Sequence, residues 1–252
     1  MSKWIMPALQ RGGNVQLFCF PFAGGGASAY RTWLRENTPE LEVAAIQLPG
    51  RENRITEPLL YDMKSVINSL VEELPRHITR PYAFFGHSLG ARMAFEVART
   101  LSKRGHQPPA HIFVSGSRSP EIPEPRPLHK LTDKEFCDEL GRFGGTPREL
   151  MENPELMALY LPILRADFTV DETYEYTAEN PLPVPITAFC GIDDPEATPH
   201  EMLGWKNHTT GVFNFTQIEG DHFFIQTQWA EVLKLITDTV KEGACAEHCI
   251  AM

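Results

Sequence analysis

The 252-residue sequence lacks the features of exported, membrane-spanning and nucleic-acid-binding proteins. No apolar run approaches the ~18 residues of a membrane span, and no basic segment followed by an apolar core opens the chain. The cysteines, five in number and scattered, argue against a disulfide framework and favour a reducing compartment. With 33 acidic and 23 basic residues, the net charge of −10 argues against a nucleic-acid partner. We expect a cytoplasmic monomer with no nucleic-acid or membrane partner.

The order of apolar segments along the chain predicts the fold class. Strand-like and helix-like segments alternate, which is typical of a mainly parallel sheet covered by helices on both faces. Apolar side chains recur at helical spacing over 62–74 and again over 229–240. At 42% apolar residues, 1–252 can form a single α/β domain around one core.

The segment 86–90, Gly-His-Ser-Leu-Gly, carries the clearest chemical signal. It follows an apolar strand-like run and precedes a helix-like stretch, so Ser88 stands at a sharp strand-to-helix turn. A G-x-S-x-G turn forces the nucleophile into a strained conformation, while Gly86 and Gly90 leave room for the helix. Ser88 is the candidate nucleophile, and His87 occupies the variable position before it, with no expected role in the chemistry. The alternative is an ordinary strand-to-helix turn.

Candidate acid and base residues follow Ser88 in the chain order of such hydrolases, the acid first and the histidine last. The strand-like segment 185–190 leads to Asp193 and Asp194, and the last strand-like segment is followed by His222. His222 can take the proton of the serine while a carboxylate binds its other nitrogen. The residues alone leave both aspartates open, because an Asp pair before proline also forms turns and caps.

The first strand-like segment ends in a loop, 21–27, with three consecutive glycines. Backbone N–H groups of Phe22 or Ala23, together with that of Leu89, are predicted to face a substrate carbonyl oxygen as it gains charge. A phosphate-binding Walker loop is a weaker alternative, because no lysine follows the glycines. A dinucleotide-binding loop is also weaker, because it spaces its glycines as G-x-G-x-x-G.

Residues 118–185 interrupt the alternation, and we expect them to form a helical lid insertion. Four prolines between 120 and 127 indicate an extended linker, and 132–135 match a capping box that starts a helix. The next helix, 155–168, is apolar nearly all round. We predict that it faces the core on one side and an acyl cavity on the other, with pocket residues Leu156, Leu159, Tyr160, Leu161 and Leu164. The alternative is a purely structural insertion.

Seven ordered motifs extend over nearly the whole chain: FCFPFAGG (18–25), LPGRE (48–52), GHSLG (86–90), GGTP (144–147), LRADF (164–168), GIDD (191–194) and DHFF (221–224). Together they resemble the stand-alone type II thioesterases of polyketide and nonribosomal peptide synthesis, and the medium-chain thioesterase of animal fatty acid synthase. The resemblance implies an α/β-hydrolase fold with Ser88 as nucleophile, Asp194 as acid and His222 as base. One departure is Asp221, where the family often has glycine.

The resemblance also implies the reaction: hydrolysis of acyl thioesters on the phosphopantetheine arm of an acyl or peptidyl carrier protein, a transient partner. It implies no metal and no cofactor of the protein's own. A carboxylesterase or a cyclising acyltransferase is an alternative enzyme, and a non-catalytic hydrolase-fold binding protein is an alternative of another class. We expect the carrier to dock at 118–130, where Arg118, Arg126 and Lys130 outnumber Glu121 and Glu124. A solvated loop is the alternative there.

Two further histidines and the C-terminal tail receive structural interpretations. His200 and His208 precede the last strand, too early for the base, and we expect both on the surface. Cys245, His248 and Cys249 have a spacing that could bind a metal, but in a polar terminal tail we expect disorder.

Overall fold

The structure, a computed structural model, describes residues 2–6, 12–36, 38–141 and 153–250, with side chains described up to residue 243. The described residues form a seven-stranded sheet in the order β1-β3-β2-β4-β5-β6-β7. All neighbouring strands are parallel except β1 and β3, which are antiparallel. The strands are β1 Ile5–Met6, β2 Val15–Phe20, β3 Leu41–Ile46, β4 Tyr82–His87, β5 His111–Ser115, β6 Ile186–Gly191 and β7 Phe213–Ile218.

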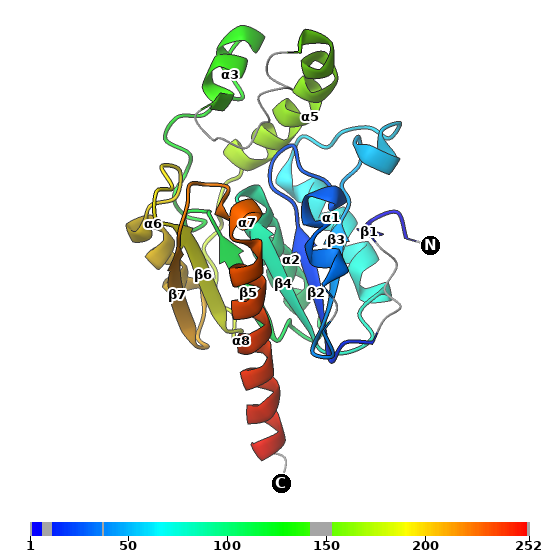
Figure 1. Cartoon of the computed structure of the whole chain (residues 1–252), viewed down its shortest axis with the longest axis vertical. Helices are drawn as coiled ribbons and strands as arrows, with labels where there is room; N and C mark the ends of the chain where they lie inside the picture. The colour runs from blue at the N-terminus through cyan, green and yellow to red at the C-terminus, as the bar shows by residue number, and fades with distance from the viewer. Residues whose placement is uncertain (1, 7–11, 37, 142–152, 251–252) are drawn as a thin grey trace.

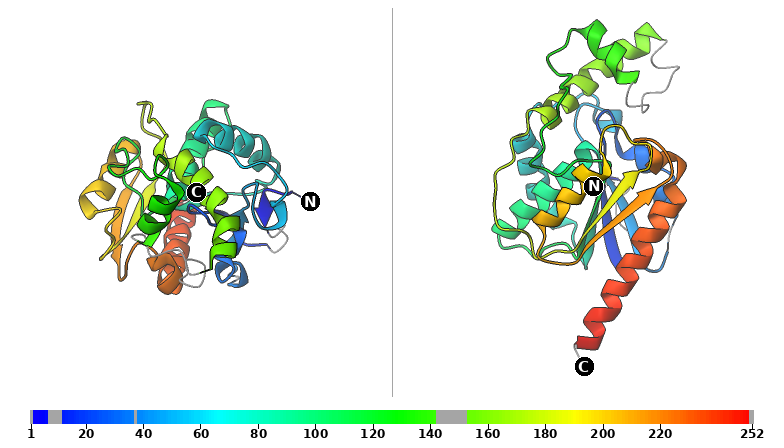
Figure 2. Two further views of the ribbon diagram at one scale, coloured as in Figure 1. Left: turned by 90° about the horizontal axis from the view of Figure 1, so that it is seen from above. Right: turned by 90° about the vertical axis from the view of Figure 1, so that its left-hand side faces the viewer.

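Helices cover both faces of the sheet, as the alternation predicts (Figures 1 and 2). One face packs against α1, α2 and α6, and the other against α7, α8 and the 3-10 turns η1 and η2. Strands β2 to β6 are therefore buried along their whole length, which explains their continuous apolar runs. The α-helices are α1 Met63–Glu73, α2 Leu89–Lys103, α3 Asp133–Leu140, α5 Pro154–Glu172, α6 Pro199–Leu203, α7 Phe224–Thr227 and α8 Trp229–Ile250; the 3-10 turns are η1 Ala27–Tyr30, η2 Trp33–Arg35, η3 Glu52–Arg54, η4 Leu74–Arg76 and η6 Gly204–His208.

Between β5 and β6 the chain forms α3 and α5, which lie beyond the carboxyl ends of the strands (Figure 1). The predicted capping box is present, because Thr132 and Glu135 exchange side-chain and backbone hydrogen bonds at the start of α3. The two helices share a small apolar core of their own, made of Leu128, Phe136, Leu140, Met157, Leu164 and Phe168. The GGTP motif at 144–147 lies outside the described residues. We call 118–185 the lid.

The expectation of a disordered C-terminal tail is wrong. Helix α8 continues to Ile250, and its last turns project beyond the rest of the molecule (Figure 1). The side chains of Cys245, His248 and Cys249 lie outside the described ones. None of the described helices is both long enough and apolar enough to cross a membrane.

Candidate active site

Ser88 occupies the sharp turn between β4 and α2 with φ 55° and ψ −124°, an unusual backbone conformation for a residue other than glycine. The flanking glycines explain how the turn is possible. A Cβ on Gly86 would lie 2.1 Å from the carbonyl oxygen of Gly90, and one on Gly90 would lie 2.2 Å from that of Phe20. An ordinary turn requires neither the strain nor this close approach, so the structure supports the nucleophile elbow.

Asp194 and His222 meet at the same edge of the sheet, because β6 and β7 are parallel neighbours and each residue follows the end of its strand. The Nδ1 atom of His222 lies 2.9 Å from Asp194 Oδ2 and 3.1 Å from Oδ1, and both side chains are buried. Asp194 Oδ1 also accepts the backbone N–H groups of Glu196 at 2.8 Å and Ala197 at 3.3 Å. Asp193 is exposed to solvent. Of the two aspartates, Asp194 is therefore the one that contacts the predicted base.

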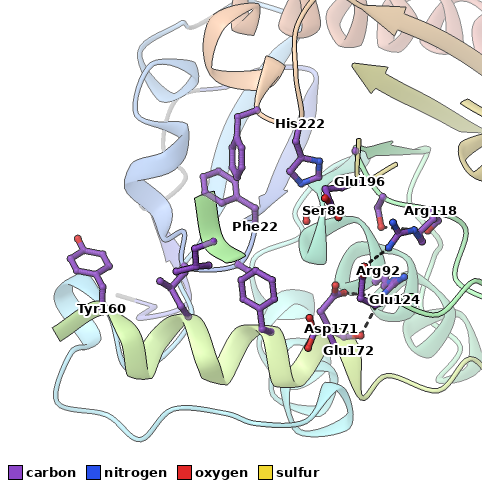
Figure 3. Close-up of a pocket in the computed structure, with 18 residues that line it drawn as sticks. Phe22, Ser88, Arg92, Arg118, Glu124, Tyr160, Asp171, Glu172, Glu196 and His222 are labelled. Carbon is purple, nitrogen blue, oxygen red and sulfur yellow. Dashed lines mark hydrogen bonds and ion pairs between the residues drawn. The ribbon is translucent and has the colours of Figure 1, made fainter. Parts of the chain in front are cut away.

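Ser88 and His222 line one cavity, and Figure 3 shows the imidazole beside the serine. Because Nδ1 of His222 is bound to the carboxylate, Nε2 is the ring nitrogen that can exchange a proton with the serine hydroxyl. The structure thus brings together all three residues that the sequence selects, from three separate strand ends.

His87 is a buried neighbour of the base and does more than fill the turn. Its ring lies 5.0 Å from that of His222, and its Nδ1 is 3.0 Å from the hydroxyl of Ser115. Burial, with the nearby His222 charge as a smaller cause, lowers the pKa of His87 well below its usual value. His87 is therefore neutral at neutral pH and adds no positive charge beside an imidazolium at His222.

The loop after β2 lies against the cavity, with Phe22, Ala23 and Gly24 in its wall. The N–H of Gly24 is already bound, because it donates to Asp167 of α5 at 2.7 Å. Leu89 is the first residue of α2, where the N–H has no partner within the helix. Within the described part of the chain, the N–H groups of Phe22, Ala23 and Leu89 have no protein acceptor. The predicted donors therefore all remain available for an oxyanion, and Ala23 is the one next to the anchored Gly24.

The cavity has a volume of about 120 Å³ and two unlike sides. Its apolar side includes Tyr160, Leu164 and Phe168 from α5 and Leu140 from α3. Its other side is charged and was not predicted from the sequence. Figure 3 shows those charged side chains on the side of Ser88 away from Tyr160; they are Arg92, Arg118, Glu124, Asp171, Glu172 and Glu196.

The five lid residues predicted to line the cavity divide into two groups. Tyr160 and Leu164 line it. Leu156 and Leu159 are 42% and 68% exposed and are absent from the wall, and Leu161 packs against the small lid core instead. The cavity follows the i, i+4 row of Tyr160, Leu164 and Phe168, and the helix period places Leu159 and Leu161 about 100° to either side of that row. Leu156 lies on the same row, one turn before Tyr160, where the helix is exposed beyond the cavity wall. For these three leucines the prediction of cavity lining is wrong.

Most of the charged side chains hold one another by ion pairs. Arg92 contacts Asp171 at 3.0 Å, and Arg118 binds both Glu124 and Glu201. Arg118 was expected in an exposed docking segment, but it is buried in the cavity wall. Burial raises the pKa of Glu172, which accepts the N–H groups of Leu128 and His129. Within the described residues, no group of three or more His, Cys, Asp or Glu side chains could hold a metal ion.

Comparison with known proteins identifies the family. Residues 15–240 match the thioesterase domain model. The chain belongs to the thioesterase family. It is 41% identical to linear gramicidin dehydrogenase LgrE of Brevibacillus parabrevis over 95% of this chain and 93% of that protein, and 39% identical to gramicidin S biosynthesis protein GrsT of Aneurinibacillus migulanus over 94% and 93%. It is similar to the solved structure of the type II thioesterase YbtT from the yersiniabactin pathway, with a TM-score of 0.87 and 32% identity over 95% and 99% of the two chains.

The thioesterase family members share the α/β-hydrolase fold that the motifs imply, and their reaction is hydrolysis of a thioester bond. The word dehydrogenase in the first relative's name has no counterpart in the glycine loop of this chain. Its three glycines, 24–26, are contiguous, whereas a dinucleotide-binding loop spaces them. The thioesterase interpretation agrees with the elbow, the buried His–Asp pair and the N–H groups available for an oxyanion.

Proposed function

We propose that this thioesterase removes acyl groups from the phosphopantetheine arm of an acyl or peptidyl carrier protein, as an editing or releasing enzyme of polyketide, nonribosomal peptide or fatty acid synthesis. The observation that supports it best is the arrangement of Ser88, His222 and Asp194 at one cavity. Relatives named for gramicidin S biosynthesis and for a mixed nonribosomal peptide and polyketide pathway support a thioester carried by a synthase.

In the proposed mechanism, Ser88 Oγ attacks the thioester carbonyl while His222 Nε2 takes its proton, and Asp194 stabilises the resulting imidazolium. The N–H groups of Ala23 and Leu89 bind the oxyanion of the tetrahedral intermediate. The C–S bond then breaks, and His222 gives its proton to the departing sulfur; a thiol pKa of ~8.5 makes this leaving group better than an alkoxide or an amine. Neutral His222 then takes a proton from water, which attacks the acyl-serine. As this second intermediate collapses, His222 returns the proton to Ser88 Oγ and the carboxylic acid is released.

The partner, the oligomeric state and the compartment are further parts of the proposal. The carrier is a transient partner, the enzyme is a cytoplasmic monomer, and it needs no cofactor because the arm belongs to the carrier. With a net charge of −10, long-range attraction to an acidic carrier is weak, so docking depends on local contacts. Since Arg118 is buried, Arg126 and Lys130 are the exposed cations of the docking segment, and the Arg126 side chain lies 3.5 Å from the cavity residue Glu196.

Steady-state kinetics with paired substrates test this function. The enzyme is incubated with a butyryl carrier, butyryl-pantetheine and an oxygen ester of butyrate, and kcat/KM is compared. The proposal expects the carrier thioester to be hydrolysed best and Ser88→Ala to abolish turnover. A preference for the oxygen ester indicates a carboxylesterase, and a cyclic product indicates an acyltransferase. A Ser88 that does not react with a fluorophosphonate indicates a binding protein.

The docking segment is tested separately with Arg126→Glu. This substitution is expected to raise KM for the acyl carrier and to leave KM for acyl-pantetheine unchanged, because the small substrate lacks the carrier surface. An equal response of both substrates, or of neither, excludes this segment as the docking site.

A further inference from the structure

Two motifs without a role in the mechanism meet in one buried ion pair. Arg51, from the LPGRE motif, binds Asp167, from the LRADF motif on α5, through two parallel hydrogen bonds, with 2.7 Å between Nη2 and Oδ1. Both side chains are 5% exposed or less. A buried ion pair adds little net stability, because desolvation offsets most of the attraction. The position of this pair next to loop 21–27 therefore requires an explanation other than stability.

Both members of the pair bind the loop that carries Ala23. Asp167 Oδ2 accepts the N–H of Gly24 at 2.7 Å, and Arg51 Nη1 donates to the carbonyl oxygen of Gly25 at 2.9 Å. The Ala23–Gly24 and Gly25–Gly26 peptides are thereby fixed from one side. Since the orientation of the Ala23–Gly24 peptide restricts that of the preceding one, these bonds also determine where the N–H of Ala23 points.

The lid helix contacts the same loop at a second point. Gly24 has φ +79°, and a Cβ there would lie 2.5 Å from Leu164 Cδ2. Leu164 and Asp167 are one turn apart on α5, so the helix touches Gly24 with an apolar side chain and holds its N–H with a carboxylate. The position of the loop therefore depends on how α5 packs against it.

We propose that Asp167, held by Arg51, is a positioning residue for the oxyanion hole: it keeps the N–H of Ala23 directed at the cavity and makes that donor depend on the packing of the lid helix. This inference rests on the proposed function, because it assigns Ala23 to the oxyanion. A donor that binds only the tetrahedral intermediate contributes to kcat and hardly to KM.

The test measures hydrolysis of butyryl-pantetheine by Asp167→Leu, which removes the acceptor, and by Asp167→Asn, which keeps one oxygen. Removal of an oxyanion donor typically lowers kcat by about 10²–10³-fold. We expect a loss of ~100-fold for Asp167→Leu and ~10-fold for Asp167→Asn, with KM changed by less than about threefold. Arg51→Lys, which loses the bidentate geometry but keeps the charge, is expected to fall between them.

Two inhibitors distinguish positioning from a general loss of structure. Butylboronic acid forms a tetrahedral adduct on the serine, and its Ki is expected to rise by the same factor as kcat/KM falls. The butyramide analogue of the substrate, in which NH replaces sulfur, stays planar, and its Ki is expected to be unchanged. If both inhibitors weaken together, or if KM rises while kcat is retained, the proposal is wrong.

An ion pair outside the cavity wall, with a buried arginine and a half-buried glutamate, provides the control. Arg99, 5% exposed like Arg51, pairs with Glu96 on α2. Glu96→Leu is expected to lower the melting temperature without the loss in kcat. An equal kcat loss in this control overturns the inference. If Asp167→Leu does not fold, the proposal is tested with Asp167→Asn and Arg51→Lys. In these variants the Ki of butylboronic acid should rise while that of the butyramide analogue stays unchanged. Wild-type hydrolysis that requires Ser88 is established first, since its absence refutes the proposed function rather than this inference.

Discussion

Replacing Asp194 by asparagine should abolish most of the activity by reversing the hydrogen bond to the base. Asp194 Oδ1 accepts two backbone N–H groups, from Glu196 and Ala197, while the carboxylate also accepts Nδ1–H of His222. Asparagine can satisfy the two backbone donors only with its oxygen, so its NH₂ group faces Nδ1. His222 then accepts at Nδ1 and carries its proton on Nε2, where it cannot take the proton of Ser88.

The size of the expected decrease in kcat follows from this change of tautomer. In a serine protease the corresponding change lowers kcat about 10⁴-fold, equivalent to ~5.5 kcal/mol at ~1.36 kcal/mol per factor of ten. We expect a similar loss for Asp194→Asn, measured as thiol release from butyryl-pantetheine. Asp193→Asn is the matched control, because the side chain of Asp193 is exposed, and it should change kcat by less than about threefold. Comparable losses in the two variants, or a larger loss for Asp193→Asn, would refute the assignment.

Three further predictions concern the cavity, the elbow and pH. Leu140→Trp should lower kcat/KM for hexanoyl-pantetheine at least ~10-fold but leave kcat/KM for acetyl-pantetheine unchanged. Leu159→Trp, at an exposed position, should change neither value. Equal losses for both chain lengths would mean that Leu140 does not limit the cavity. Gly86→Ala should prevent stable folding, seen in the melting temperature, whereas Gly141→Ala, with open space around it, should not; a stable Gly86→Ala would contradict the elbow geometry. Burial lowers the pKa of His111 from 6.5 to about 4, so between these pH values the unfolded chain binds a proton at His111 and the folded protein does not. The free energy of unfolding should therefore decrease as pH falls from 6.5 to 4, by about 3 kcal/mol from this residue. Urea unfolding at several pH values measures this slope, and His111→Gln should remove that part of it.

The three residues of the candidate triad could be brought together from the sequence because their positions follow from local patterns. Each comes within a few residues of the end of a strand, and in a parallel sheet the carboxyl ends of the strands lie on one side. The glycines around Ser88 and the alternation of strands and helices are likewise visible over short stretches of sequence. What the residues alone left open, the choice between Asp193 and Asp194, required the resemblance or the burial that the structure shows.

The rest of the site could not be predicted because it depends on contacts between distant segments. Arg51 and Asp167 are 116 residues apart, and neither motif by itself indicates that its charged residue pairs with the other. His208 was expected on the surface but is buried, where it binds Glu121 at 2.7 Å and lies 3.2 Å from the hydroxyl of Tyr176. His200 is exposed, as expected. A charged residue in a loop is usually solvated, so sequence patterns give no signal for the few that pair in the interior.

The charged side of the cavity has a consequence for the length of chain that the enzyme accepts. A space of about 150 Å³ holds one benzene ring, and the cavity beside Ser88 has about 120 Å³, so on the proposed function we expect short acyl groups to fit it best. A longer alkyl chain extending toward Arg92 and Arg118 would meet side chains that already have ionic partners and would strip water from them without an apolar contact in return. On the proposed function, we expect these ion pairs to limit how far an apolar acyl chain can extend and so to favour short acyl groups over a long apolar product.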